Sequence, residues 1–165
     1  MRKLKPISKE SVPRALEKAE RYRLLNEPFF AESICLDILA VDPADQRALA
    51  TYVLALADQT ALGVERAAQR ATAAIDRLTL EYDRLYYRGI VSERRAEAIL
   101  ERGVHGMSGA AWHHLDDAMA FYEKADALQR DDANDDAILR YNTCVRQIEA
   151  HHLVEPAEDE GSRLE

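Results

Sequence analysis

The residues best suited to chemistry stand between Trp112 and Asp117, where two histidines precede two aspartates. His113 and Asp117 are four residues apart, so on a helix they would share one face and could hold a metal ion together. Two ligands do not complete a site, and no third His or Cys stands at the spacing of a zinc motif. The segment is therefore interpreted as the solvated start of a helix. No metal and no cofactor is expected.

Two other segments could bind an anion. The glycines of GVHGMSG, residues 103–109, precede a helix-forming segment as in a phosphate-binding loop. The Lys-Ser/Thr pair of the nucleotide loop is missing, however, and the segment follows a helix, so a flexible loop is the better interpretation. Arg140, Asn142 and Arg146 could also grip an anion, because the last two are i,i+4 on a helix. A solvated surface is the simpler interpretation of these three residues.

Acid–base chemistry has weak support. The DDANDD segment, residues 131–136, precedes a predicted helix, where acidic side chains cap the helix and complement its dipole. No Ser–His or Cys–His pair has the local context of a nucleophile. No catalytic residues are assigned, and the chain is predicted not to be an enzyme.

Helices must position these groups, because the composition favours helix almost throughout. The five prolines stand at 6, 13, 28, 43 and 156, so residues 44–155 contain none, and Ala, Leu, Arg and Glu are abundant there. Alternating apolar and polar residues of the strand type are absent. We expect an all-α protein of about seven helices, spanning residues 11–25, 28–42, 44–58, 64–78, 80–102, 110–130 and 135–152, with a looser link at 59–63.

The first two helices have the clearest boundaries. Ser11 is a good N-cap, and Pro13 fits the first turn, where a missing N–H costs nothing. Asn26 tolerates the left-handed conformation that ends a helix, and a proline turns the residue before it away from helical angles. Asp42-Pro43 therefore ends the second helix and closes an antiparallel hairpin.

The length of 165 residues suits a single domain. Residues 11–152 are predicted to form it, between a flexible basic N-terminus, 1–10, and an acidic disordered tail, 153–165. No apolar run reaches the ~20 residues that cross a bilayer, and the first residues lack the apolar segment of a signal peptide. We expect a cytoplasmic protein with no membrane partner.

The charge is negative overall and unevenly distributed. A net charge of −8 disfavours nucleic acid as the partner. Residues 1–23 carry eight Lys and Arg against three acidic residues, whereas residues 131–165 carry three Arg against ten acidic residues. Solvated termini explain this pattern most simply. Attraction between the head of one copy and the tail of the next, or docking of an acidic partner on the basic end, is the alternative.

Cys35 and Cys144 each stand among apolar residues at helical spacing. Such cysteines are usually small buried hydrophobes in a chain without a secretion signal. A disulfide between them is the open alternative.

The first hairpin resembles the tetratricopeptide repeat, whose pattern is W-x2-L-G-x2-Y, then A-x3-F-x2-A, then P. In residues 12–45, Tyr22, Ala31 and Pro43 match the tyrosine, the first alanine and the proline. A second match to A-x3-F-x2-A consists of Ala118, Tyr122 and Ala125. The chain thus resembles a divergent, bacterial-type member of this family.

The sequence also departs from the repeat pattern. Ala15, Lys18 and Ala19 replace the Trp-Leu-Gly group, and Cys35 and Ile38 replace the aromatic residue and the second alanine. Residues 46–80 need an insertion near Gly63 to keep the register, and the two following helices are longer than a repeat allows.

The resemblance implies antiparallel hairpins stacked as a right-handed α-α superhelix, closed by a C-terminal helix. In this family the first, third, fifth and seventh helices line a concave groove that holds a peptide or a partner's helix. The implied groove residues are Leu16, Glu20, Arg23, Arg47, Ala50, Leu54, Tyr86, Ile90, Arg94, Leu139 and Arg146. Tyr82, Tyr86, Tyr87 and Tyr122 could line this groove or fill the core, and core is the commoner role.

The resemblance therefore implies a non-catalytic scaffold for protein–protein interaction, with a protein or peptide partner of unknown identity. The alternative is a structural homo-oligomer that assembles through the end faces of the helical stack.

Overall fold

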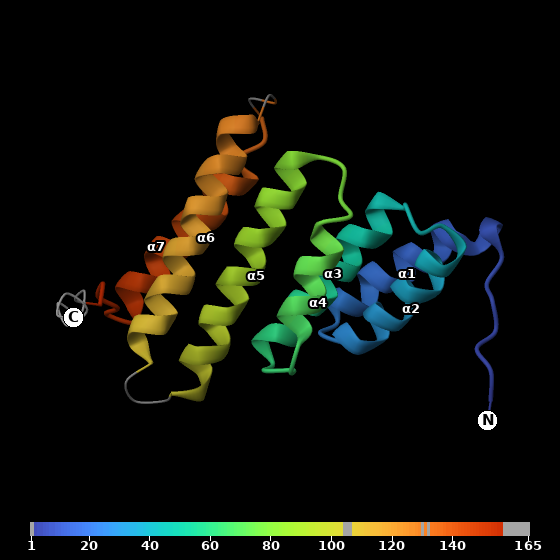
Figure 1. Ribbon diagram of the computed structural model, residues 1–165, viewed down its shortest axis with the longest axis horizontal. Helices are drawn as coiled ribbons and strands as arrows, with labels where there is room; N and C mark the ends of the chain where they lie inside the picture. The colour runs from blue at the N-terminus through green and yellow to red at the C-terminus, as the bar shows by residue number, and fades with distance from the viewer. Residues whose placement is uncertain (1, 104–106, 130, 132, 157–165) are drawn as a thin grey trace, which may run out of the picture.

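The computed structural model describes residues 2–103, 107–129, 131 and 133–156, and within these residues the protein is all-α, with seven α-helices and no strand. Figure 1 shows their order along the chain. A short 3₁₀ turn, η1 (Lys9–Ser11), leads into the helices. The helices are α1 (Val12–Leu24), α2 (Pro28–Val41), α3 (Gln46–Ala61), α4 (Ala67–Ile75), α5 (Glu81–Arg102), α6 (Ser108–Leu128) and α7 (Asp136–Ala150).

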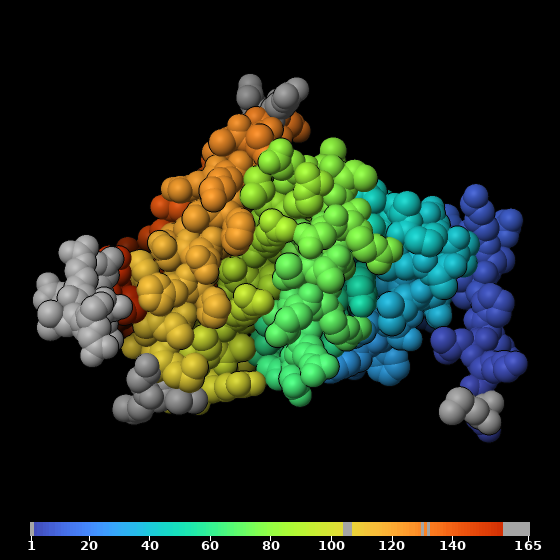
Figure 2. Space-filling model, viewed as in Figure 1, coloured from blue at the N-terminus to red at the C-terminus, as the bar shows by residue number. Residues whose placement is uncertain are grey.

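Each helix packs against the next one in the chain, and α5 and α6 share the most extensive contact. In addition, α3 packs directly on α1 and on α5, whereas α2 and α4, and likewise α4 and α6, have no comparable contact among the described residues. The α1–α2 pair lies at one end of the long axis and the α6–α7 pair at the other (Figure 1). Figure 2 shows that side chains of α4, α5 and α6 cover one side of this arrangement.

The predicted boundaries of the first hairpin are confirmed. Asn26 has the left-handed φ of 59° after α1, and Asp42 is extended, with φ −133° and ψ 95°, directly before Pro43. Pro13 lies in the first turn of α1. The predicted cap differs, because the Ser11 hydroxyl donates to the Ser8 carbonyl at 2.8 Å and accepts no N–H from the helix.

The predicted link at residues 59–63 is wrong, because α3 continues to Ala61. Two polar residues that suggested a loop are buried and find partners within the fold. Thr60 donates to the Leu56 carbonyl at 2.8 Å, and the Gln59 amide donates to the Glu32 carboxylate at 2.5 Å. The chain turns instead at Gly63, whose φ of 76° suits glycine, and α4 is shorter than predicted.

The C-terminal boundary also differs from the prediction. Leu153 is 8 % exposed and belongs to the core, so the folded part reaches beyond residue 152. At the start of α7, Asn134 accepts the N–H of Asp136 at 3.0 Å, whereas Asp135, the residue before the helix, makes no side-chain cap. The rest of the predicted tail, residues 157–165, lies outside the described residues.

The core is built from apolar residues that recur at helical spacing. Four alanines of α4 and its Ile75 are buried, as are Leu49, Val53 and Leu56 of α3. Leu24 of α1 is apolar but 84 % exposed, so it lies outside the core. It stands one residue after Arg23, which turns toward α3, so the 100° step of the helix carries Leu24 away from the core.

Cys35 and Cys144 are free and buried, in α2 and α7, so the open alternative of a disulfide is excluded. Burial raises the pKa of each thiol to about 12. Because the thiolate is the reactive form, we expect neither cysteine to react with iodoacetamide in the native protein at neutral pH, and both to react in denaturant. Mass spectrometry counts the carbamidomethyl groups. Rapid labelling of one cysteine before unfolding would contradict its burial.

Within the described residues, each helix is too short or too polar to cross a bilayer.

Candidate partner-binding face

Helix α3 is buried on all sides except one stripe. Ten of its residues are buried, and they include polar residues such as Thr51. The residues left partly or fully open are, from Arg47 on, spaced three or four apart, which places them on one face of the helix; Gln46 is the first residue of the helix. They are Gln46, Arg47, Ala50, Leu54, Asp58 and Ala61. Three of them, Arg47, Ala50 and Leu54, are the predicted groove residues of this helix.

Ion pairs on both sides of this stripe tie α3 to its neighbours. Arg47 pairs with Glu20 of α1 at 3.2 Å, and Asp58 accepts a hydrogen bond from Nε of Arg23, also on α1, at 2.7 Å. On the other side, Arg94 Nε of α5 lies 3.7 Å from Asp58. Asp58 thus stands between two arginines, and five charged side chains from three helices share one surface.

We call this surface the odd-helix face and define it as Glu20, Arg23, Arg47, Ala50, Leu54, Asp58 and Arg94. It consists of predicted groove residues plus Asp58. Its two central arginines are already engaged, because Arg23 binds Asp58 and Arg94 also binds Glu97 at 2.6 Å. Burial alone would lower the pKa of Arg94, but the hydrogen bond and charge of Glu97 raise it above its ordinary value. The Arg94 guanidinium group therefore stays charged, and its hydrogen bond to Glu97 holds it in position.

A second polar cluster joins the last three helices. Glu93 of α5 is 1 % exposed, and it accepts hydrogen bonds from the Tyr122 hydroxyl of α6 at 2.8 Å and from Arg140 of α7 at 3.1 Å. Burial and the nearby Glu93 charge raise the pKa of the Tyr122 phenol, so it stays protonated and donates. Burial would lower the pKa of Arg140, yet Glu93 raises it. The cluster is a fully partnered structural network.

Tyr86 and Tyr87 point to different neighbours. Tyr86 stacks on Tyr82 with a centroid distance of 5.8 Å and lies 5.9 Å from the Tyr122 ring, so it packs at the edge of the core toward α6. Tyr87 lies edge-on to Tyr86 at a centroid distance of 5.5 Å, and burial, followed by the charge of Asp83, raises the pKa of its phenol to about 12.

Two predicted groove residues are corrected by their burial. Leu16 is 3 % exposed and Ile90 is 2 % exposed, and both belong to the core, so a partner has no access to them. Leu139 and Arg146 are exposed on α7 but have no ion pair or ring contact with the odd-helix face in the described part of the chain. The odd-helix face retains six of the predicted groove residues, namely Glu20, Arg23, Arg47, Ala50, Leu54 and Arg94.

Sequence reasoning missed Asp58 and Glu93. Asp58 continues the spacing of Arg47, Ala50 and Leu54 by four residues, and this signal was available. No signal in the sequence pointed to Glu93. A glutamate followed by two arginines is usual on a solvated helix surface, and nothing in the local sequence indicates that this one is buried. Only its partners from α6 and α7 distinguish it.

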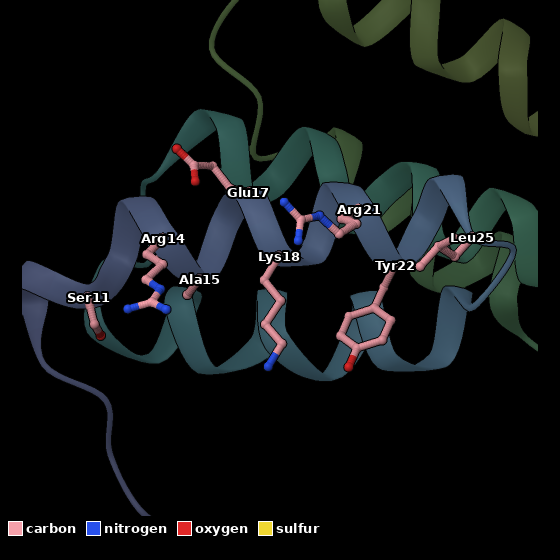
Figure 3. A pocket seen from close by; sticks show the side chains of 8 residues that line it. All are labelled: Ser11, Arg14, Ala15, Glu17, Lys18, Arg21, Tyr22 and Leu25. Carbon is pink, nitrogen blue, oxygen red and sulfur yellow. The ribbon is translucent and has the colours of Figure 1, made fainter.

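A hollow of about 680 Å³ lies on the outer side of α1, away from the odd-helix face, and one helix alone lines it. Figure 3 shows its side chains in a row along α1, with Lys18 and Tyr22 pointing the same way. Arg14, Lys18 and Arg21 outnumber Glu17 in its lining, so the hollow is basic, and Leu25 lies at its end.

The other chemical candidates gain no support. His113 and Asp117 are both exposed, and the His113 ring lies edge-on to Trp112. No group of three possible metal ligands occurs among the residues described. Arg140 is held by Glu93, and six residues separate it from the exposed Arg146, so the two arginines do not face one anion. Of the glycine-rich segment 103–109, residues 104–106 lie outside the described residues.

Comparison with known proteins gives no match: no family model fits the chain, and no curated protein and no solved structure is similar to it.

Proposed function

We propose that this protein is a non-catalytic scaffold that binds a protein or peptide on the odd-helix face, in a tetratricopeptide-like right-handed stack closed by α7. The observation that carries the proposal is the single open stripe of α3. A helix buried on every other side offers a rigid surface, and rigid surfaces bind with a smaller loss of conformational entropy.

The packing of the odd-numbered helices supports a curved stack. α3 contacts both α1 and α5 directly, while the even-numbered helices α2, α4 and α6 have no comparable contact with one another in the described part of the chain. Helices that approach more closely on one side bend the stack toward that side, as in helical repeat proteins. The odd-helix face would then be the concave one.

The chemistry of the face suggests how a partner would bind. Ala50 and Leu54 offer an apolar strip for an apolar side chain or the apolar face of a helix. The Arg47–Glu20 pair beside the strip is well exposed, and such pairs contribute little to stability, so either charge can exchange its partner at low cost. The half-buried Arg23–Asp58 pair has less freedom and holds α1 in place.

Leu54→Glu tests this function. Peptides selected from a random display library on the immobilised protein should lose at least about tenfold in affinity for this variant, because a carboxylate replaces the centre of the apolar strip. Isothermal titration calorimetry measures the affinity, and circular dichroism checks that the helices persist.

Gln69→Glu is the matched control, because Gln69 is exposed on α4, outside the odd-helix face. Arg47→Glu is a second variant, chosen because its exposed side chain can change without loss of folding. Equal losses in the Leu54 and Gln69 variants would refute this binding face. Failure to enrich any peptide would refute the scaffold function itself.

A further inference from the structure

Among residues inside helices, large exposed apolar side chains concentrate on the first two and the last two helices. Within the helices they occur only in α1, α2, α6 and α7 among the described residues, and α3, α4 and α5 have none inside their bounds. Leu25, directly after α1, is 64 % exposed, Phe30 of α2 is 57 % exposed, and Ile138 of α7 is 41 % exposed. Repeat proteins that end as monomers usually carry polar outer faces on their terminal repeats. Both ends of this protein depart from that rule.

The α1–α2 pair carries basic side chains beside apolar ones. Tyr22 of α1 stacks on Phe30 at a centroid distance of 5.3 Å, and the hollow on α1 adds the cations of Arg14, Lys18 and Arg21. None of these three cations has an ion pair within the described part of the chain. We call Arg14, Lys18, Arg21, Tyr22, Leu25 and Phe30 the head surface.

The α6–α7 pair carries the opposite charge, again beside apolar side chains. A hollow of about 290 Å³ between α6 and α7 has Ala137, Ile138 and Tyr141 as its apolar lining and Glu123 and Asp126 at its edge. Asp126 also borders a neighbouring hollow of about 240 Å³, which includes Asp131 and Asp135. We call Glu123, Asp126, Asp131, Asp135, Ile138 and Tyr141 the tail surface.

We propose that the head surface of one copy binds the tail surface of a second copy, so that the protein assembles head to tail. The head surface lies on the α1–α2 pair and the tail surface on the α6–α7 pair, with α3, α4 and α5 between them, so one molecule cannot bring its own head and tail together (Figure 1). Each surface combines apolar side chains with charged ones, and the charges of the two surfaces have opposite signs. Such a heterologous contact repeats along a chain of copies, and it closes into a ring where the rotation allows.

This assembly is separate from the scaffold function, because it uses neither Leu54 nor any other residue of the odd-helix face. Longer chains of copies would place several odd-helix faces side by side, which raises the avidity for a multivalent partner.

Sedimentation velocity over a range of protein concentrations tests the assembly. At low salt and high concentration we expect species larger than the 18.7 kDa monomer. High salt should shift the equilibrium back toward monomer, because it screens the charges of the head and tail surfaces. A protein that stays monomeric at the highest concentration in low salt would overturn the proposal and leave the binding of peptides to the odd-helix face untouched.

Charge reversal separates this contact from unspecific association. Arg14→Glu with Lys18→Glu reverses the head, and Glu123→Lys with Asp126→Lys neutralises the tail; all four side chains are exposed, so folding should persist. Each double variant alone should associate at least about tenfold more weakly. An equal mixture of the two should recover association in pairs, because the unchanged head of the tail variant then meets the unchanged tail of the head variant. No recovery in the mixture would also overturn the proposal.

Discussion

Glu93→Gln should lower the free energy of unfolding by about 3 kcal/mol, because it removes one partner of a buried charge pair. The Glu93 carboxylate is 1 % exposed and receives the Tyr122 hydroxyl and the Arg140 guanidinium. Glutamine keeps the shape but not the charge, so Arg140 loses its ion pair in a partly buried position. Urea denaturation followed by circular dichroism measures the loss.

Glu101→Gln is the control for this variant, because Glu101 is exposed on the same helix. A surface change of this kind should stay within about 0.5 kcal/mol of the wild type. A Glu93 variant as stable as the Glu101 variant would show that the cluster contributes no net stability. The slope of the urea transition should stay unchanged, since the same surface is exposed on unfolding.

Gly89→Ala should destabilise the protein by roughly 2 kcal/mol, although alanine is the better helix former. A Cβ at this position would lie 2.4 Å from Cε1 of Tyr122 and 2.8 Å from two further ring atoms. The Tyr122 ring is fully buried and its hydroxyl is bound to Glu93, so it cannot move aside cheaply. Overpacking of this kind costs about 1–3 kcal/mol, which exceeds the gain of up to about 1 kcal/mol in helix propensity.

A double-mutant cycle tests the cause. Tyr122→Val removes every ring atom that the new Cβ would meet, so Gly89→Ala should become neutral or stabilising in that background. Thermal unfolding of the four proteins gives the coupling energy. An equal cost in both backgrounds would assign the effect to some property of Gly89 other than its approach to the Tyr122 ring.

Both changes bear on the function, because Glu93 and Tyr122 hold α6 and α7 against α5. The α6–α7 pair carries the tail surface, whereas the odd-helix face lies on α1, α3 and α5. Loosening the cluster should therefore weaken head-to-tail assembly more than peptide binding.

The sequence alone determined the helical class, the first hairpin and much of α3. Proline positions, the left-handed tolerance of Asn26 and the helix-forming composition of residues 44–58 act within one or two turns of the chain, so a local pattern is sufficient evidence for them. The buried alanines of α4 follow from the same 3.6-residue period.

Only the tertiary structure decided which polar groups are buried and which apolar groups are open. Gln59 remains in α3 because Glu32, 27 residues earlier, accepts its amide hydrogen bond. Glu93 is buried because Tyr122 and Arg140, 29 and 47 residues away, pair with it. Ile90 is buried although its spacing suits an open groove. In each case the free energy of burying the side chain depends on residues that are distant in the sequence and adjacent only in the fold. A local sequence pattern therefore cannot predict it.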